Sequence, residues 1–136
     1  MDKRMKRSLI DTNILIYYLA DTIPQEELDT IEKILKTSFN ISIITKIEFL
    51  GWEKHTEEGY EKAKEFISFA NAILLTNKIA DLSIFIRRTY KIKLPDAVIA
   101  ATALSNNLIL VTRNTKDFRG VKDLEIYNPF KLNDKR

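Results

Sequence analysis

The chain has 136 residues, of which 45% are hydrophobic and 30% charged, a composition typical of a single globular domain spanning residues 1–136. It contains no cysteine, which excludes disulfides, thiolate catalysis and cysteine-ligated zinc, and its one histidine, His55, excludes mechanisms that need two imidazoles. The formal net charge of +3 is compatible with a nucleic-acid partner. Because the chain has no cysteine and no segment that is apolar for long enough to cross a membrane, we expect a cytoplasmic protein.

Short apolar segments alternate with amphipathic segments along the chain. In chain order they predict a strand at 7–11, helices at 13–20 and 24–38, a strand at 40–44, helices at 45–55 and 57–70, a strand at 72–76, helices at 78–91 and 95–107, and strands at 108–112 and 124–128. The predicted strands are apolar without alternation and are separated by helices. This pattern is typical of an α/β fold with a parallel sheet covered on both faces.

Several predicted helices have a clear apolar face. We expect these inward residues: Leu28, Ile31, Ile34 and Leu35 in 24–38; Tyr60, Ala63, Phe66, Ile67 and Ala70 in 57–70; Ile79, Leu82, Ile86 and Tyr90 in 78–91. The chain has only three glycines and no glycine-rich phosphate loop, which argues against nucleotide binding through such a loop.

Four carboxylates recur where a predicted strand leads into a helix. Asp11 ends the first strand, Glu48 lies in the first turn after residues 40–44, Asp96 opens the helix at 95–107, and Asp117 follows the strand at 108–112. Binding sites in open parallel sheets form beyond the carboxyl ends of the strands. The sequence therefore predicts an acidic pocket at this edge, which Asp96 joins if its helix begins there.

Each carboxylate also has a structural interpretation. Thr45 and Glu48 form a T-x-x-E capping box, Asp11 could cap the helix at 13–20, Asp117 fits a turn, and Asp96 fits the positive end of a helix dipole. The four together are harder to explain this way. A cap is worth about 1 kcal/mol, whereas two carboxylates ~4 Å apart repel by roughly 4 kcal/mol at an effective dielectric of 20. Converging carboxylates thus imply raised pKa values or a cation among them.

A site made only of oxygen ligands suits a hard cation, Mg²⁺ or Mn²⁺. Such a cation favours hydrolysis of phosphodiester bonds, because it lowers the pKa of a bound water and stabilises charge on the phosphate.

The segments LIDTNILIYYL, ISIITKIEFLGW, KLPDAVIAATAL, LILVTRNTKDF and NPF resemble the PIN-domain ribonucleases, and among these the VapC-type toxins of toxin–antitoxin pairs. The resemblance runs from Leu9 to Phe130. It implies a three-layer α/β/α sandwich with a five-stranded parallel sheet, and endonucleolytic cleavage of RNA that leaves 5′-phosphate and 3′-hydroxyl ends.

The resemblance also assigns roles to residues of this chain. Asp11 and Asp96 are expected to be the principal catalytic ligands of Mg²⁺ or Mn²⁺, and Glu48 and Asp117 to complete the catalytic site directly or through water. The residues expected to orient the carboxylates or water are Asn13, Thr112 and Asn114.

Partners are implied in the same way. Such toxins are typically homodimers, held by an antitoxin protein that places a basic side chain in the acidic pocket. Trp52 could contact a partner or belong to the core, and segments 60–66 and 87–93 could line an RNA path or form solvated helix faces.

Other functions remain to be distinguished. A PIN nuclease acting in RNA processing or on structured DNA, without an antitoxin, would share the same residues. A receiver domain would need an Asp after the strand at 72–76 and a Lys after the last strand, and neither residue is in place. A D-x-D-x-T phosphatase would need Asp where this chain has Asn13. A binding module would use the acids only as helix caps.

Overall fold

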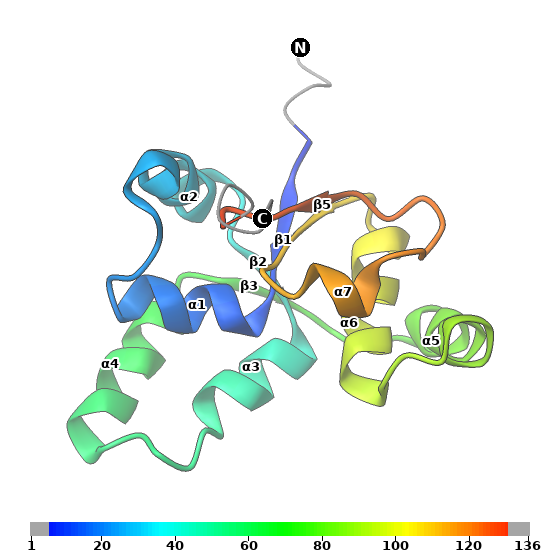
Figure 1. Ribbon diagram of the computed structural model, residues 1–136. Coiled ribbons are helices and arrows are strands. Elements are labelled where there is room, and N and C mark those ends of the chain that lie inside the picture. Colours follow the sequence, from blue (N-terminus) through cyan, green and yellow to red (C-terminus); the bar gives the residue numbers. More distant parts are fainter. Residues whose placement is uncertain (1–5, 131–136) are drawn as a thin grey trace.

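A computed structural model of the protein describes residues 6–130 (Figure 1). Five short strands form one sheet: β1 (Ser8–Ile10), β2 (Asn40–Ser42), β3 (Asn71–Ile73), β4 (Ile109–Val111) and β5 (Ile126–Tyr127). Their order is β3-β2-β1-β4-β5, and every pairing is parallel. Because β1 lies in the centre, its three residues are all buried.

Seven helices connect the strands: α1 (Thr12–Leu19), α2 (Gln25–Thr37), α3 (Ile43–Leu50), α4 (Glu57–Ile67), α5 (Asn77–Tyr90), α6 (Leu94–Ser105) and α7 (Thr115–Phe118). In Figure 1, α1, α2 and α4 lie to one side of the sheet and α5 and α6 to the other. The predicted α/β/α sandwich with a five-stranded parallel sheet is confirmed. No helix among residues 6–130 has the length and apolarity to cross a membrane.

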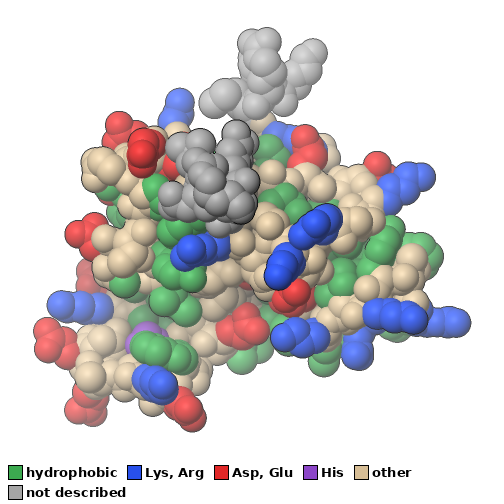
Figure 2. Space-filling model, in the orientation of Figure 1, with side chains coloured by type: hydrophobic (Ala, Val, Ile, Leu, Met, Phe, Trp, Pro, Cys, Tyr) green, Lys and Arg blue, Asp and Glu red, His purple; other side chains and the backbone are tan. Residues whose placement is uncertain are grey.

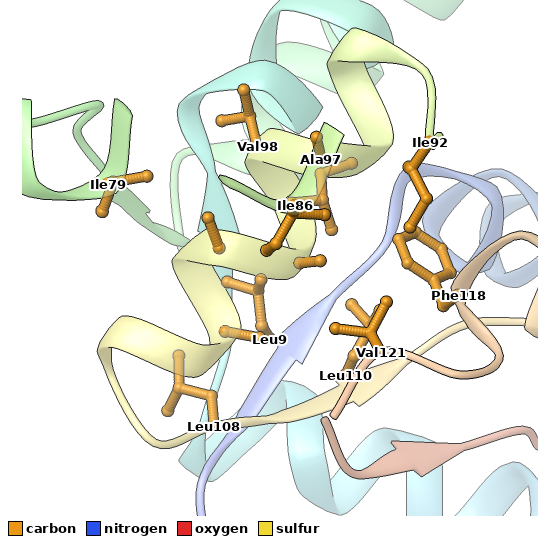
Figure 3. Close-up of a cluster of buried hydrophobic side chains, with 14 residues drawn as sticks. Leu9, Ile79, Ile86, Ile92, Ala97, Val98, Leu108, Leu110, Phe118 and Val121 are labelled. Carbon is orange, nitrogen blue, oxygen red and sulfur yellow. The ribbon is translucent and has the colours of Figure 1, made fainter. Parts of the chain in front are cut away.

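Two hydrophobic clusters fill the space between the helices and the sheet. Because successive strand residues point to opposite faces, Leu9 and Leu110 belong to the cluster under α5 and α6, which Figure 3 shows. Ile10 and Val111 belong to the cluster under α1, α2 and α4. In α6 the four alanines at 97, 100, 101 and 103 are fully buried, so this helix lies close to its neighbours.

Most predicted inward residues lie in these clusters, and Tyr60 is the exception. The apolar face of α4 is formed by Ala63 and Ile67, while Tyr60 is exposed and packs its ring against His55. The prediction for Tyr60 was therefore wrong.

Several boundaries also differ from the prediction: α4 ends at Ile67 rather than at residue 70, the strand expected at 72–76 is Asn71–Ile73, and α7 was not predicted as a helix. Ile43 and Ile44 were expected in a strand but begin α3, because the Ser42 hydroxyl caps that helix by accepting the N–H of Ile44 at 3.0 Å. The helix then ends at Leu50, where Gly51 forms its C-cap, rather than at His55. The basic chain ends at 1–5 and 131–136 lie outside the described residues.

Candidate metal-dependent nuclease site

Asp11 lies at the carboxyl end of the central strand and is also the N-cap of α1. Its Oδ1 accepts the backbone N–H of Thr12 at 2.8 Å, and its Oδ2 accepts the hydroxyl of Thr112 at 2.7 Å and the amide of Asn13 at 3.4 Å. The residue is only 5% exposed. Asp11 thus caps α1 and also faces the site, and its hydrogen bonds to Thr12, Asn13 and Thr112 fix its orientation.

The residues after β4 form the next wall of the site. The backbone N–H of Asn114 donates to the Thr112 hydroxyl oxygen at 3.0 Å, and the Asn114 amide donates to Asp117 Oδ2 at 2.7 Å. Asn13 accepts the backbone N–H of Arg113 at 3.4 Å. Asp117 lies in α7 and is exposed. Thr112 and Asn114 therefore connect Asp11 to Asp117 through one hydrogen-bonded chain, and Asn13 connects Asp11 to the backbone of Arg113.

Glu48 reaches the same edge from α3. It lies in the second turn of that helix, not in the first as expected, because α3 begins at Ile43. Its Oε1 accepts the hydroxyl of Thr12 at 2.7 Å, and that hydroxyl also lies 3.1 Å from the hydroxyl of Thr45. Since Ser42 is the cap of α3, Glu48 does not form a capping box with Thr45.

Asp96 is the third residue of α6, which begins at Leu94 with Pro95 as its second residue. Its carboxylate lies in the first turn, where the helix dipole favours negative charge. Burial nevertheless raises the pKa of Asp96, and the charges of Asp117 and Glu48 raise it further, while Lys93 acts in the opposite direction. Asp96 therefore does join the other acids at the carboxyl edge of the sheet.

The electrostatics of the site are dominated by Asp11. Burial raises its pKa to about 6, against the lowering effect of its bonds to Thr112 and the Thr12 N–H, and the charges of Asp96 and Glu48 add to the increase. At neutral pH the pocket thus holds a buried carboxylate that is costly to ionise and is repelled by its neighbours.

One groove of about 560 Å³ is lined by Asp11, Thr12, Asn13, Ile16, Glu48, Gly51, Trp52, Glu53, Asp96 and Asn114. Two predicted site residues, Asp117 and Thr112, do not line it and are connected to it by hydrogen bonds to Asn114 and Asp11. Another cavity of about 450 Å³, between α5, α6 and residues 121–123, has a single carboxylate, Asp123, in its lining. The acidic groove is therefore the better candidate for cation chemistry.

The sequence reasoning missed several residues of the groove. Thr12 stands beside Asp11 in the sequence, and this hydroxyl next to a strand-end carboxylate was an available signal. Ile16 and Glu53 gave no such signal, because only the packing of α1 and the turn after α3 brings them to the groove.

The carboxylates of the groove suit a hard cation that binds through few protein ligands. Among residues 6–130, no three His, Asp or Glu side chains are arranged to hold one metal ion together. Mg²⁺ usually binds through one or two carboxylates and retains several waters. Asp11 and Asp96 meet that requirement chemically.

Similarity to known proteins agrees with this geometry. The PIN domain family matches residues 8–124. A chain of a toxin–antitoxin complex from Klebsiella pneumoniae is 35% identical, with 90% of this chain and 97% of that chain covered and a TM-score of 0.71.

Two further solved structures are 25% identical with a TM-score of 0.75. One is VapBC2 from Rickettsia felis bound to a DNA fragment from its promoter, and the match covers 89% of this chain and 97% of that chain. The other is VapBC-1 from nontypeable Haemophilus influenzae, and the match covers 90% of this chain and 97% of that chain. No curated protein matches the chain in sequence. Given the family match over most of its length, the chain belongs to the PIN-domain family.

Proposed function

We propose that the protein is a Mg²⁺- or Mn²⁺-dependent endoribonuclease and the toxin of a toxin–antitoxin pair. The observation that carries the proposal is the buried carboxylate of Asp11, with its pKa raised to about 6, beside the carboxylates of Asp96 and Glu48. A fold without a ligand for this pocket gains nothing from such repulsion. A bound cation converts it into attraction.

The residues in and around the groove have different proposed roles. Asp11 and Asp96 would hold the cation, which when bound would supply a water of lowered pKa and neutralise charge on the phosphodiester. Glu48, held by Thr12, orients the attacking water and accepts its proton. Thr112 and Asn13 keep Asp11 in one rotamer, and Asn114 does the same for Asp117. Attack of this water on the phosphorus breaks the bond to the 3′ oxygen, which takes up a proton from solvent, so cleavage leaves 5′-phosphate and 3′-hydroxyl ends.

An antitoxin partner is supported by the similarity to chains of toxin–antitoxin complexes. The acidic groove is suited to a basic side chain from such a partner, which would compete with the cation for the same carboxylates. We also propose a homodimer, for which light scattering of the purified protein is the direct measurement. A processing nuclease without an antitoxin is distinguished by the absence of a small neighbouring gene for a DNA-binding protein.

The test is RNA cleavage by the purified protein with Mg²⁺, with Mn²⁺ and with a chelator. Asp96→Asn keeps the side-chain volume and removes the charge. We expect cleavage to fall by about 100-fold or more, since even groups that only orient a metal ligand contribute about 10–100-fold. Asp29→Asn makes the same chemical change on the exposed face of α2 and should cleave normally. Wild-type rates in Asp96→Asn, or cleavage that survives the chelator, would contradict the proposal.

A further inference from the structure

One wall of the acidic groove is apolar, and the metal site does not require it. Trp52, in the turn after α3, is 46% exposed, and Ile16, on α1, is 39% exposed, and both line the groove that contains Asp11 and Asp96. An indole with half its surface in water contributes little to the core. Beside a reactive centre it offers a flat surface for stacking.

The indole is held in place by its neighbours. The rings of Trp52 and His55 lie 5.2 Å apart at 90°, and His55 is also edge-on to the buried ring of Phe49. His55 Nε2 donates a hydrogen bond to the carbonyl oxygen of Phe49 at 2.8 Å, which fixes the turn to the end of α3. A ring fixed in advance loses little conformational entropy when a ligand stacks on it.

Glu48 and Glu53 line the groove beside Trp52, whereas Lys46 on α3 and Lys54 after Glu53 are exposed outside the lining. A phosphate between the two carboxylates would be repelled. On α4, Lys62 and Lys64 pair with glutamates and leave little free positive charge.

Basic residues lie beyond the other end of the groove, outside its lining. Lys93 precedes α6, Lys116 lies in α7, and the guanidinium of Arg113 lies over the rings of Tyr17 and Phe130. Figure 2 shows Lys and Arg side chains over α5 and α7, and both acidic and basic side chains over α4. Phosphates are thus favoured near Lys93 and Lys116, outside the acidic lining, and a neutral, flat group is favoured against Trp52.

We propose that Trp52, supported by Ile16, stacks an unpaired base of the RNA substrate next to the scissile phosphate. The inference rests on the proposed ribonuclease function and assigns this residue a binding role within it. Every base has a face that can stack, so the contact selects single-stranded RNA over paired RNA rather than one sequence. The base lies against Trp52 while the following phosphates run toward Lys93 and Lys116.

Trp52 is the only tryptophan of the chain, so its fluorescence reports the contact directly. Asp96→Asn protein is titrated with short single-stranded RNAs of random sequence, and with ribose-phosphate chains of the same length that lack bases. Binding of both is followed separately by the anisotropy of a dye on the RNA. We expect the RNA to quench the fluorescence of Trp52 in a saturable way and the chain without bases to leave it unchanged. Equal quenching by both chains, or binding of RNA without quenching, would overturn the proposal.

Kinetics provide a second, independent measurement. Trp52→Ala should raise KM for the random RNA pool by about tenfold or more, the usual loss when one stacked base loses its aromatic partner. Trp52→Phe keeps a ring and should recover most of the affinity. Phe69→Ala removes an aromatic side chain that is 75% exposed and absent from the groove, and it should leave KM unchanged.

The two proposals fail differently. If the wild-type protein does not cleave RNA with either cation, the ribonuclease function itself is wrong. If it cleaves RNA and Trp52→Ala has an unchanged KM, only the stacking role is wrong. If Trp52→Ala lowers affinity for an antitoxin but not for RNA, the wall serves the protein partner and the proposal is overturned. Should Trp52→Ala fail to fold, the quenching experiment and Trp52→Phe still decide.

Discussion

Replacing Asp11 by Asn should make the protein more stable at neutral pH while it abolishes activity. The carboxylate is 5% exposed, and burial together with neighbouring acids raises its pKa from 3.8 to about 6. Asn has nearly the same shape and carries no charge. The substitution therefore isolates the cost of ionising this position.

The magnitude follows from the two pKa values. Between pH 3.8 and about 6, the folded protein keeps a proton on Asp11 that the unfolded chain has lost, so stability falls as pH rises. Below 3.8 the proton is bound in both states, and above about 6 it is lost in both. A difference of about two pH units, at about 1.4 kcal/mol each, lowers the unfolding free energy by roughly 3 kcal/mol at neutral pH.

Part of this gain is offset by hydrogen bonds. In Asp11→Asn the amide oxygen of the new side chain can still accept the N–H of Thr12, but an amide nitrogen would replace the oxygen that accepts the hydroxyl of Thr112. A weakened hydrogen bond costs about 1 kcal/mol. We therefore expect Asp11→Asn to be more stable than wild type by about 2 kcal/mol at neutral pH, and less stable by about 1 kcal/mol near pH 4.

The assay is urea unfolding of both proteins from about pH 4 to pH 8, with a chelator present because a bound cation would itself stabilise ionised Asp11. Asp29→Asn serves as the control, since Asp29 is exposed on α2. The difference in stability between Asp11→Asn and wild type should change by about 3 kcal/mol across the range. A difference that does not depend on pH would show that ionising Asp11 costs nothing and would refute the reasoning.

Three further predictions test other parts of the structure. Mn²⁺ at about 100 times its Kd should raise the unfolding free energy of wild type by about 2.7 kcal/mol, and clearly less for Asp96→Asn; equal shifts in thermal unfolding would place the cation elsewhere. Thr112→Val should lower stability by about 1–3 kcal/mol at neutral pH, because ionised Asp11 loses its buried donor; urea unfolding that matches wild type would contradict this. Leu9→Ala should cost about 2–5 kcal/mol at every pH through a cavity in the central strand, yet retain RNA cleavage while folded; a loss of cleavage in the folded variant would mean that the core shapes the site.

Much of the fold could be read from hydrophobic patterning. Unalternating apolar strands separated by amphipathic helices are typical of a sheet covered on both faces, and the observed sheet is of that kind. The start of α3 was missed because helix capping competes with strand propensity at this point in the chain. Ile43 and Ile44 suit a strand, but Ser42 caps a helix at that point, and a single hydrogen bond moves the boundary.

The carboxylates were also predictable, because the ends of parallel strands meet at one edge of a sheet. Asp11, after the central strand, and Asp96, alone in an apolar helix, were visible in the sequence as charges in unsuitable surroundings. Whether Asp96 reached the same edge depended on the direction of α6, which no local pattern gives.

The sequence by itself determined most of the helices and strands and the positions of Asp11 and Glu48 after strands, since these depend on residues that are close neighbours in the chain. Whether Asp96 joins them was decided by the direction of α6. Only the tertiary structure decided how strongly Asp11 is perturbed, because burial and the approach of Asp96 and Glu48 bring together groups from three separate helices and loops. The same is true of Trp52, which enters the groove through the short turn after α3. The chemical type of each side chain is given by the sequence, whereas the pKa of Asp11 and the walls of the groove depend on distances between remote segments.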